Sequence, residues 1–283
     1  MPDLIDLIRK WWKQVFLVVL FSVIIVGVIT FLKPRQYLAV ATSVPASSFS
    51  ADRGKIFSEN IQALYSSLGT PDDLDLILGT GQLDTVYLAV TDRFNLFDHY
   101  KVKEKGNAAR IKAAVLLKDN TSVLKSAYGE LKVKVWDTDK NLAPQLSNGI
   151  MEKLQSIHQD LQSEGNRSTL AGLQAVREKI GIQIDSIKAF LSTASMLAGG
   201  DDPYTTRLNT LTAQLSKYEK LVTEYEMLLS SKPPVLITVE KAKTPEWPDR
   251  PKRVKILVAT ALLSLLFSLV LVLVLERRKQ INQ

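Results

Sequence analysis

The sequence predicts an α+β membrane protein, in which two transmembrane helices flank a base domain of strands and helices, and a long helical hairpin projects from that base. Three observations predict this fold. An uncharged apolar run lies near each end of the chain. One stretch between them alternates apolar and polar residues as a strand does, and helical segments with apolar residues at steps of three and four follow it.

Two apolar runs, Val15 to Leu32 and Ile256 to Leu275, are long enough to cross a hydrocarbon core about 30 Å thick. Tryptophan and basic residues flank them, as is typical of helix ends at headgroup depth. The first run could instead be a cleavable signal peptide. It is longer than a signal core, however, and charged residues separate it from the small residues that could be cleaved. We expect transmembrane helices over 15–32 and 254–275, and short termini over 1–14 and 276–283.

The formal net charge of +7 raises nucleic acid as a partner, so the location of the charge matters. Residues 1–35 and 252–283 hold eleven of the 36 basic residues and three of the 29 acidic ones, which leaves 25 and 26 for residues 36–251. The basic charge therefore belongs to the membrane flanks, and the nearly neutral centre argues against nucleic-acid binding.

Two membrane passes place both termini in one compartment. Basic residues are nearly balanced across each helix, so the positive-inside rule gives only a weak preference. Because a loop of more than 200 residues can be translocated largely regardless of its charge, we expect cytoplasmic termini and an exported loop. The absence of cysteine from the sequence suits either compartment.

Strands and helices alternate in the loop. The expected elements are a strand over Tyr37–Val44, a helix over Lys55–Leu68, a short helix after Pro71, a turn at Gly79–Gly81, a helix over Ala108–Leu124, a strand over Leu131–Trp136 and a last strand over Val235–Glu240. The strand near Val133 is the clearest, because its alternate residues form one apolar face. We expect strands from both ends and from the middle of the loop to pair, forming a base domain of residues 33–141 and 231–244.

The arm, residues 142–230, is expected to be a helical hairpin. A long helix runs from about Leu142 to Leu197, a glycine-containing turn ends it, and a second helix follows. The second helix carries a heptad seam, which consists of Leu208, Leu211, Leu215, Tyr218, Val222, Tyr225 and Leu229. The seam could only close the hairpin, or it could also pack protomers together, and the pattern does not decide between these interpretations.

Residues for catalysis or metal binding are scarce. There is no cysteine, and neither histidine has a partner motif: His158 is expected on the surface of the long helix and His99 in a loop. Residues 137–141 begin like a calcium loop but lack its glycine and its final glutamate, so a turn and helix cap is expected there. No glycine-rich phosphate loop occurs. We therefore expect no catalytic residue, no cofactor and no metal, and an enzyme acting on lipid-linked sugar has little support.

Directly before the second membrane helix, residues 245–253 place prolines at every third position. Such spacing favours an extended polyproline II segment that resists collapse. The candidate motif consists of Pro245, Pro248, Pro251, Lys252 and Arg253. The simplest interpretation is a stiff spacer that sets the angle between the loop and its membrane helix.

With its two terminal anchors, Tyr37 in the first strand, the strand 131–137 leading to a long helix with Asn148, and the PxxPxxPKR stretch at 245–253, the chain resembles the chain-length determinant (Wzz-like) family of bacterial polysaccharide co-polymerases. The resemblance implies a non-enzymatic inner-membrane protein with a periplasmic loop and cytoplasmic termini. It also implies a homo-oligomer that governs the length of a polysaccharide such as O-antigen, capsule or exopolysaccharide.

The expected partners, beyond the lipid bilayer and further copies of the chain, follow from the same resemblance. A membrane polysaccharide polymerase is expected to contact the second transmembrane helix. The alternative function is a periplasmic scaffold of an export complex, linking an outer-membrane channel and a separate tyrosine kinase without setting chain length.

Overall fold

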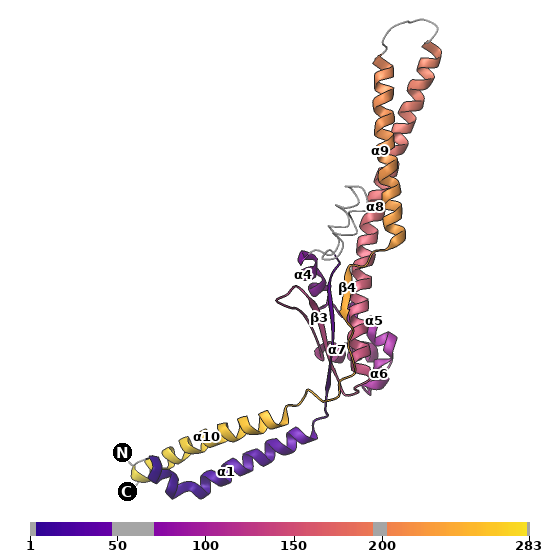
Figure 1. The fold of residues 1–283 in the computed structure, drawn as a ribbon. Coiled ribbons are helices and arrows are strands. Elements are labelled where there is room, and N and C mark those ends of the chain that lie inside the picture. Colours follow the sequence, from indigo (N-terminus) through magenta and orange to yellow (C-terminus); the bar gives the residue numbers. More distant parts are fainter. Residues whose placement is uncertain (1–3, 47–70, 195–202, 282–283) are drawn as a thin grey trace. The chain divides into compact units, whose positions relative to one another are not determined.

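The computed structural model describes residues 4–46, 71–194 and 203–281 (Figure 1). The expected helix over 55–68 and most of the expected turn near residue 200 lie outside these residues. The chain divides into two compact units. The anchor unit comprises Met1–Ala39, Val135–Gln145 and Lys243–Gln283, and the loop unit comprises Val40–Lys134 and Leu146–Ala242.

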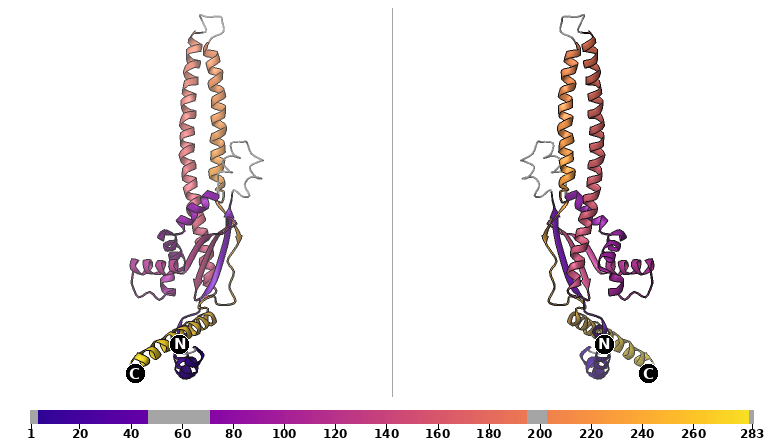
Figure 2. Two further views of the ribbon diagram at one scale, coloured as in Figure 1. Left: turned by 90° about the vertical axis from the view of Figure 1, so that its left-hand side faces the viewer. Right: turned by 90° about the vertical axis from the view of Figure 1, so that its right-hand side faces the viewer.

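Two helices, α1 (Leu4–Leu32) and α10 (Arg253–Ile281), pack side by side in the anchor unit (Figures 1 and 2). Each contains a segment long and apolar enough to span a membrane, Trp11–Leu32 with a mean hydropathy of 3.1 and Arg253–Leu275 with 2.9. Only 6% and 17% of these segments are buried inside the protein, so neither is the core helix of a soluble domain. The two expected transmembrane helices are confirmed as helices whose apolar surface needs a lipid environment.

The two membrane helices approach closely where Gly27 of α1 lies beside Leu257 of α10, and Thr30 of α1 is buried three residues further on. Ser264, Ser268 and Val272 of α10 are buried at four-residue spacing on one face. The serine hydroxyls donate to backbone carbonyls of their own helix, at 3.1 Å to Ala261 and 2.8 Å to Leu265. Small residues with locally satisfied hydroxyls let transmembrane helices approach closely, and many of the bulky apolar residues of both helices are exposed.

A four-stranded sheet has the order β2-β3-β1-β4 (Figure 1). Its strands are β1 (Tyr37–Pro45), β2 (Thr121–Lys125), β3 (Leu131–Asp137) and β4 (Leu236–Glu240). β1 pairs with β4 in antiparallel register from Thr42 opposite Glu240 to Pro45 opposite Leu236, with an irregularity after Thr42. Strands from both ends and from the middle of the loop do join in one sheet, and residues 131, 133 and 135 are buried as the alternation predicted.

The strand β2 contradicts the expected helix over 108–124. Helix α7 (Asn107–Asp119) ends where the next two side chains bond back to carbonyls of its last turn. The amide of Asn120 donates to the carbonyl of Leu116 at 3.0 Å, and the hydroxyl of Thr121 donates to that of Leu117 at 2.7 Å. Side chains that bond nearby backbone compete with helix continuation, and the chain then turns into a strand.

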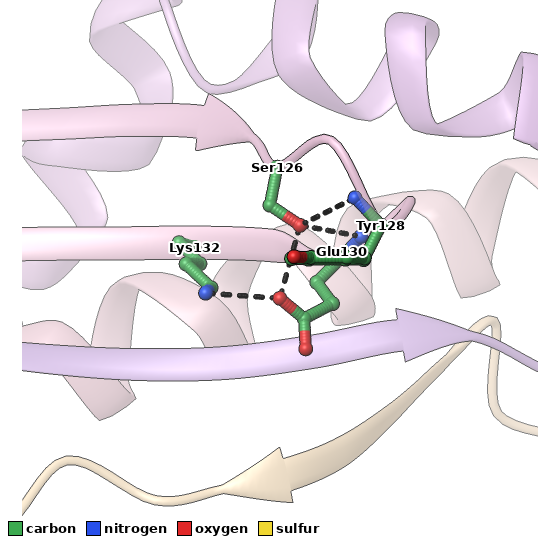
Figure 3. Close-up of polar contacts among 4 residues, drawn as sticks. All are labelled: Ser126, Tyr128, Glu130 and Lys132. Atoms are coloured by element: carbon green, nitrogen blue, oxygen red, sulfur yellow. Dashed lines mark hydrogen bonds and ion pairs between the residues drawn. The ribbon is translucent and has the colours of Figure 1, made fainter.

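The turn between β2 and β3 is held by the hydroxyl of Ser126 (Figure 3). This oxygen accepts the backbone N–H groups of Tyr128 and Glu130, both at 3.3 Å, and donates to Glu130 Oε2 at 2.9 Å. The same carboxylate oxygen lies 2.9 Å from Lys132 Nζ. Hydrogen bonds from Lys132 and then Ser126 lower the pKa of Glu130, because they stabilise its charged form.

Between Pro71 and the start of β2, the structure describes four helices: α4 (Pro71–Thr80), α5 (Asp84–Phe94), α6 (Leu96–His99) and α7. The short helix after Pro71 is confirmed, whereas α5 and α6 were not predicted, and His99 ends α6 instead of lying in a loop. Arg110 of α7 holds Asp92 of α5 by two hydrogen bonds of 2.7 and 2.6 Å. The large, fully buried apolar residues of the loop unit come from these helices, the sheet and α8, and they include Leu74, Ile77, Val86, Val90, Leu96, Leu117, Leu131, Val133, Leu146, Ile150, Leu154 and Leu236.

Helix α8 (Leu142–Ala194) is 53 residues long, about 80 Å at 1.5 Å per residue. Its first part packs on the sheet through Ser147, whose hydroxyl donates to the carbonyl of Val133 at 2.8 Å and accepts the N–H of Ala41 at 3.0 Å. Its second part pairs with α9 (Pro203–Ser231), as Figure 2 shows. The expected hairpin of two long helices is therefore present.

The expectation that His158 lies on the surface of α8 is wrong. The residue is 6% exposed, and its Nε2 lies 2.9 Å from the hydroxyl of Thr80 at the end of α4. That hydroxyl donates to the carbonyl of Leu76 at 3.0 Å, so the imidazole Nε2–H is the donor to Thr80. The sequence pattern could not place α4 against this turn of α8, because the contact joins residues far apart in the chain.

Candidate functional site at the proline-rich segment

The proline-rich segment is bonded through its backbone to the residue that leads from α1 into β1. Gln36 N–H donates to the carbonyl of Arg250 at 2.9 Å, and the carbonyl of Gln36 accepts the N–H groups of Asp249 and Arg250 at 2.9 and 3.2 Å. This isolated antiparallel bridge joins the chain leaving the first membrane helix to the chain entering the second. The segment is therefore fixed at residues 249–250 and is not a free linker.

Trp136, near the end of β3, clamps the same two residues from the side. Its indole Nε1–H donates to Asp249 Oδ2 at 2.8 Å, and the guanidinium of Arg250 lies 3.7 Å from the centre of the ring. The first contact is a hydrogen bond to a charged acceptor and the second is a cation–π interaction. Trp136 occupies the half-buried face of β3, opposite Leu131, Val133 and Val135. We call Gln36, Trp136, Asp249 and Arg250 the clamp.

The first turn of α10 is tied to the last turn of α1. The guanidinium of Arg253 lies 4.5 Å from the centre of the Phe31 ring, and Lys252 Nζ lies 3.7 Å from Asp249 Oδ1. The N–H of Arg253 donates to the carbonyl of Pro251 at 2.9 Å. Two members of the predicted motif, Lys252 and Arg253, thus take part in contacts that hold α10 in place.

The three prolines of the motif differ in exposure. Pro245 and Pro251 are half-buried, whereas Pro248 is exposed, and Trp247 between them exposes 81% of its surface. The sequence pattern identified the segment but not its partner Trp136. An indole donor on the less apolar face of an alternating strand was the one available signal. The motif's assignment as the functional site stays a prediction.

The seam residues of α9 face α8 over the outer part of the hairpin. Leu211 forms a buried cluster with Ile180 and Ile184 of α8, and Leu208, Leu215 and Tyr218 pack against it. Further along, Val222 is buried, and Tyr225 and Leu229 are half-buried. The seam closes the hairpin at this cluster, and packing between protomers stays a prediction.

The side chains with catalytic or metal-binding chemistry do not gather in one place within the described residues. No group of three or more His, Cys, Asp or Glu residues in those ranges could hold a metal ion. Asp137 and Asp139 instead accept the N–H groups of Asp139 and Asn141, both at 2.8 Å, which makes the expected turn before α8.

An open groove of about 450 Å³ runs between α8 and β4 in the loop unit. Three of its polar lining residues, Asn148, Glu152 and Gln159, are already engaged in the fold. Asn148 exchanges two hydrogen bonds with the backbone of Ala242, at 2.9 and 3.3 Å, and Glu152 pairs with Arg93 at 2.7 Å. The Asn148 contact fixes the chain just after it leaves β4.

Neither a protein-family model nor a curated protein sequence matches the chain. A full-length bacterial polysaccharide co-polymerase is similar in structure at a TM-score of 0.44 and 13% identity, covering 100% of this chain and 99% of that one. A variant of the lipopolysaccharide O-antigen chain-length regulator WzzBSF of Shigella flexneri gives 0.28 and 11%, and a fragment of the polysaccharide co-polymerase WzzB of Salmonella Typhimurium gives 0.30 and 12%. Each match covers 76% of this chain and 100% of the other. The structural neighbours are thus polysaccharide co-polymerases and chain-length regulators, at low identity and low TM-score.

Proposed function

We propose that this protein is a non-enzymatic regulator of polysaccharide chain length that acts as an inner-membrane co-polymerase beside a membrane polymerase. The observation that carries the proposal is the clamp, which joins Gln36 and Trp136 to the proline-rich segment on which the resemblance to chain-length determinants rests. Through it, the second membrane helix is linked mechanically to the sheet strand that bears Trp136. A chain whose described residues gather no catalytic group can act on a partner by geometry in this way.

In this proposal α10 is the helix that meets the polymerase. One face of α10 is buried at Ser264, Ser268 and Val272, and Leu257 lies beside Gly27 of α1, whereas many bulky apolar side chains on the rest of its surface are exposed. The exposed ones include Leu262, Leu263, Leu266, Phe267 and Val270. A second membrane protein can pack on such a surface through van der Waals contacts. A change in the loop would shift α10 through the clamp and alter how long the growing polymer stays on the enzyme.

The remaining parts of the proposal concern assembly and location. The loop is periplasmic, both termini are cytoplasmic, and several copies assemble through their loops. The seam that closes the hairpin can also contact a neighbouring copy, because two of its residues, Tyr225 and Leu229, are only half-buried within the protomer. Such a contact between loops would make the clamps of neighbouring copies open or close together.

The test replaces Pro245, Pro248 and Pro251 together by alanine in a strain that lacks the native gene. The expected result is an altered length distribution of the surface polysaccharide at a normal protein level, because the segment loses its stiffness. The matched control replaces Pro234, which is exposed and lies outside the segment, by alanine, and it should leave the length distribution unchanged. An unchanged length distribution in the triple variant would show that the motif is only a spacer.

Deletion of the gene separates this function from that of an export scaffold. A chain-length regulator predicts polymer that still reaches the surface with its length control lost. A scaffold predicts loss of surface polymer while polymerisation continues inside the cell.

A further inference from the structure

Trp247 exposes 81% of its surface in the middle of the proline-rich segment, and the clamp does not use it. An indole combines a large apolar body with one N–H donor, so it favours surroundings that are apolar at one end and wet at the other. In membrane proteins this place is the interface between headgroups and acyl chains. So large an exposed indole indicates that something outside the chain covers Trp247.

Trp247 lies in the anchor unit, a few residues from the helix that spans the membrane at residues 253–275. Asp249, two residues away, is bonded to Gln36 and Trp136, so the Cα of residue 247 lies within about 7 Å of a fixed point. The α10 helix begins six residues after Trp247, and α1 ends four residues before Gln36. Both membrane helices thus begin or end within a few residues of the clamp, and Trp247 lies two residues from its member Asp249.

The segments that join the loop to the two membrane helices carry an excess of exposed basic residues. Within residues 33–36 and 243–255 the exposed basic residues are Lys33, Arg35, Lys243, Arg250, Lys252 and Lys255. The exposed acidic residue in the same ranges is Glu246, since Asp249 is half-buried and bonded to Trp136. A basic cluster of this kind at the end of a membrane helix is attracted to anionic phospholipids.

We propose that Trp247 and these basic side chains form a docking surface for anionic lipid headgroups. The indole enters the interface on the loop side of the membrane, and the lysines and arginines meet the lipid phosphates. Together they set the depth at which the clamp, and with it the start of α10, sits relative to the bilayer. This inference rests on the two membrane helices and not on the proposed regulatory function.

The test uses the full-length protein reconstituted into vesicles of phosphatidylglycerol and phosphatidylcholine, with bromine at a shallow acyl position of part of the lipid. Fluorescence is compared between the wild type and Trp247→Phe, so that the difference reports Trp247 while Trp11, Trp12 and Trp136 contribute to both. The expected difference spectrum is blue-shifted from that of an indole in water and loses most of its intensity to the bromolipid. A water-like difference spectrum without this quenching would overturn the proposal.

Two further variants test the part played by charge. Lys252→Gln with Lys255→Gln, or replacement of phosphatidylglycerol by phosphatidylcholine, should weaken the quenching of Trp247. Lys188→Gln, on an exposed position of α8, is the control and should leave it unchanged. If neither the double lysine variant nor the replacement of phosphatidylglycerol altered the quenching of Trp247, the anionic headgroup would be refuted as the partner. An indole that is open to iodide in vesicles but shielded in native membranes would assign the surface to a protein partner instead.

Discussion

Breaking the hydrogen bond between Trp136 and Asp249 should open the proline-rich segment to protease. Trp136→Phe keeps an aromatic ring beneath Arg250 but removes the donor to Asp249, which now lies 2.8 Å from the indole nitrogen. A hydrogen bond to a carboxylate contributes about 1.5–3 kcal/mol. The lower part of that range applies here because the Asp249 side chain is 29% exposed. We therefore expect local opening to become about 1.5–2 kcal/mol easier, which is a roughly 10- to 30-fold larger open population.

Trypsin measures this opening directly, because the segment contains a cleavable bond between Lys252 and Arg253. When closing is faster than cleavage, the cleavage rate follows the open population. The reconstituted protein is digested, and the fragment ending at Lys252 is followed by mass spectrometry. Trp136→Leu should be faster still, by roughly 30- to 150-fold over the wild type, since the cation–π contact with Arg250 adds about 0.5–1 kcal/mol.

The matched control is Glu246→Gln, an exposed change in the same segment that should cleave at the wild-type rate. A double-mutant cycle with Asp249→Asn then isolates the pair. If the two single variants cleave like the wild type, or if their effects simply add, the hydrogen bond does not hold the segment and the clamp must be redrawn.

Three other predictions concern the loop unit and are measured by thermal unfolding of the reconstituted protein. Gly149→Ala should destabilise the loop unit by about 1–3 kcal/mol, because a Cβ would lie 2.9 Å from Phe94 Cε2. Gly172→Ala meets open space and should instead stabilise α8 by about 0.5–1 kcal/mol. Equal effects of the two substitutions would contradict this packing. Tyr87→Phe should cost about 1 kcal/mol through loss of the 2.7 Å bond to the carbonyl of Gly81. Burial first, and then the charge of Asp84, raises the pKa of Tyr87 from 10.0 to about 12. The neutral phenol therefore stabilises the fold fully below pH 10, and this contribution is lost between pH 10 and 12. If Tyr87→Phe left the loss of thermal stability at alkaline pH unchanged, this reasoning would be refuted. The lowered pKa of Glu130 predicts the opposite dependence, with stability present above its unfolded pKa and lost as the pH falls through the folded one, and Glu130→Gln should remove this part of the acid response.

The sequence predicted elements whose periodicity is long or strict. The two membrane helices, the alternating strand near Val133 and the two helices of the hairpin were all confirmed, because each pattern is determined by one dominant environment. Short elements were less predictable. The helix expected over 108–124 ends at Asp119, where Asn120 and Thr121 bond back to it, and such local competition leaves no periodic trace.

Contacts between distant segments could not be read from any pattern. His158 was expected on the surface and is buried against Thr80, and Trp136 was seen as a strand residue without its role as the partner of Asp249 and Arg250. In the candidate site, the proline spacing identified the segment and the basic residues after it. What holds that segment depends on the pairing of residue 36 with residue 250, which only the folded chain provides.

The length distribution of the surface polysaccharide after deletion of the gene tests the central claim most directly. Surface polymer is extracted from three strains and separated by size: the deletion strain, the deletion strain carrying the wild-type gene, and the deletion strain carrying Trp136→Leu. The account predicts polymer on the surface of all three, with a defined modal length only in the strain that carries the wild-type gene. Unchanged lengths after deletion, or surface polymer lost while polymerisation continues, would contradict a regulator of chain length.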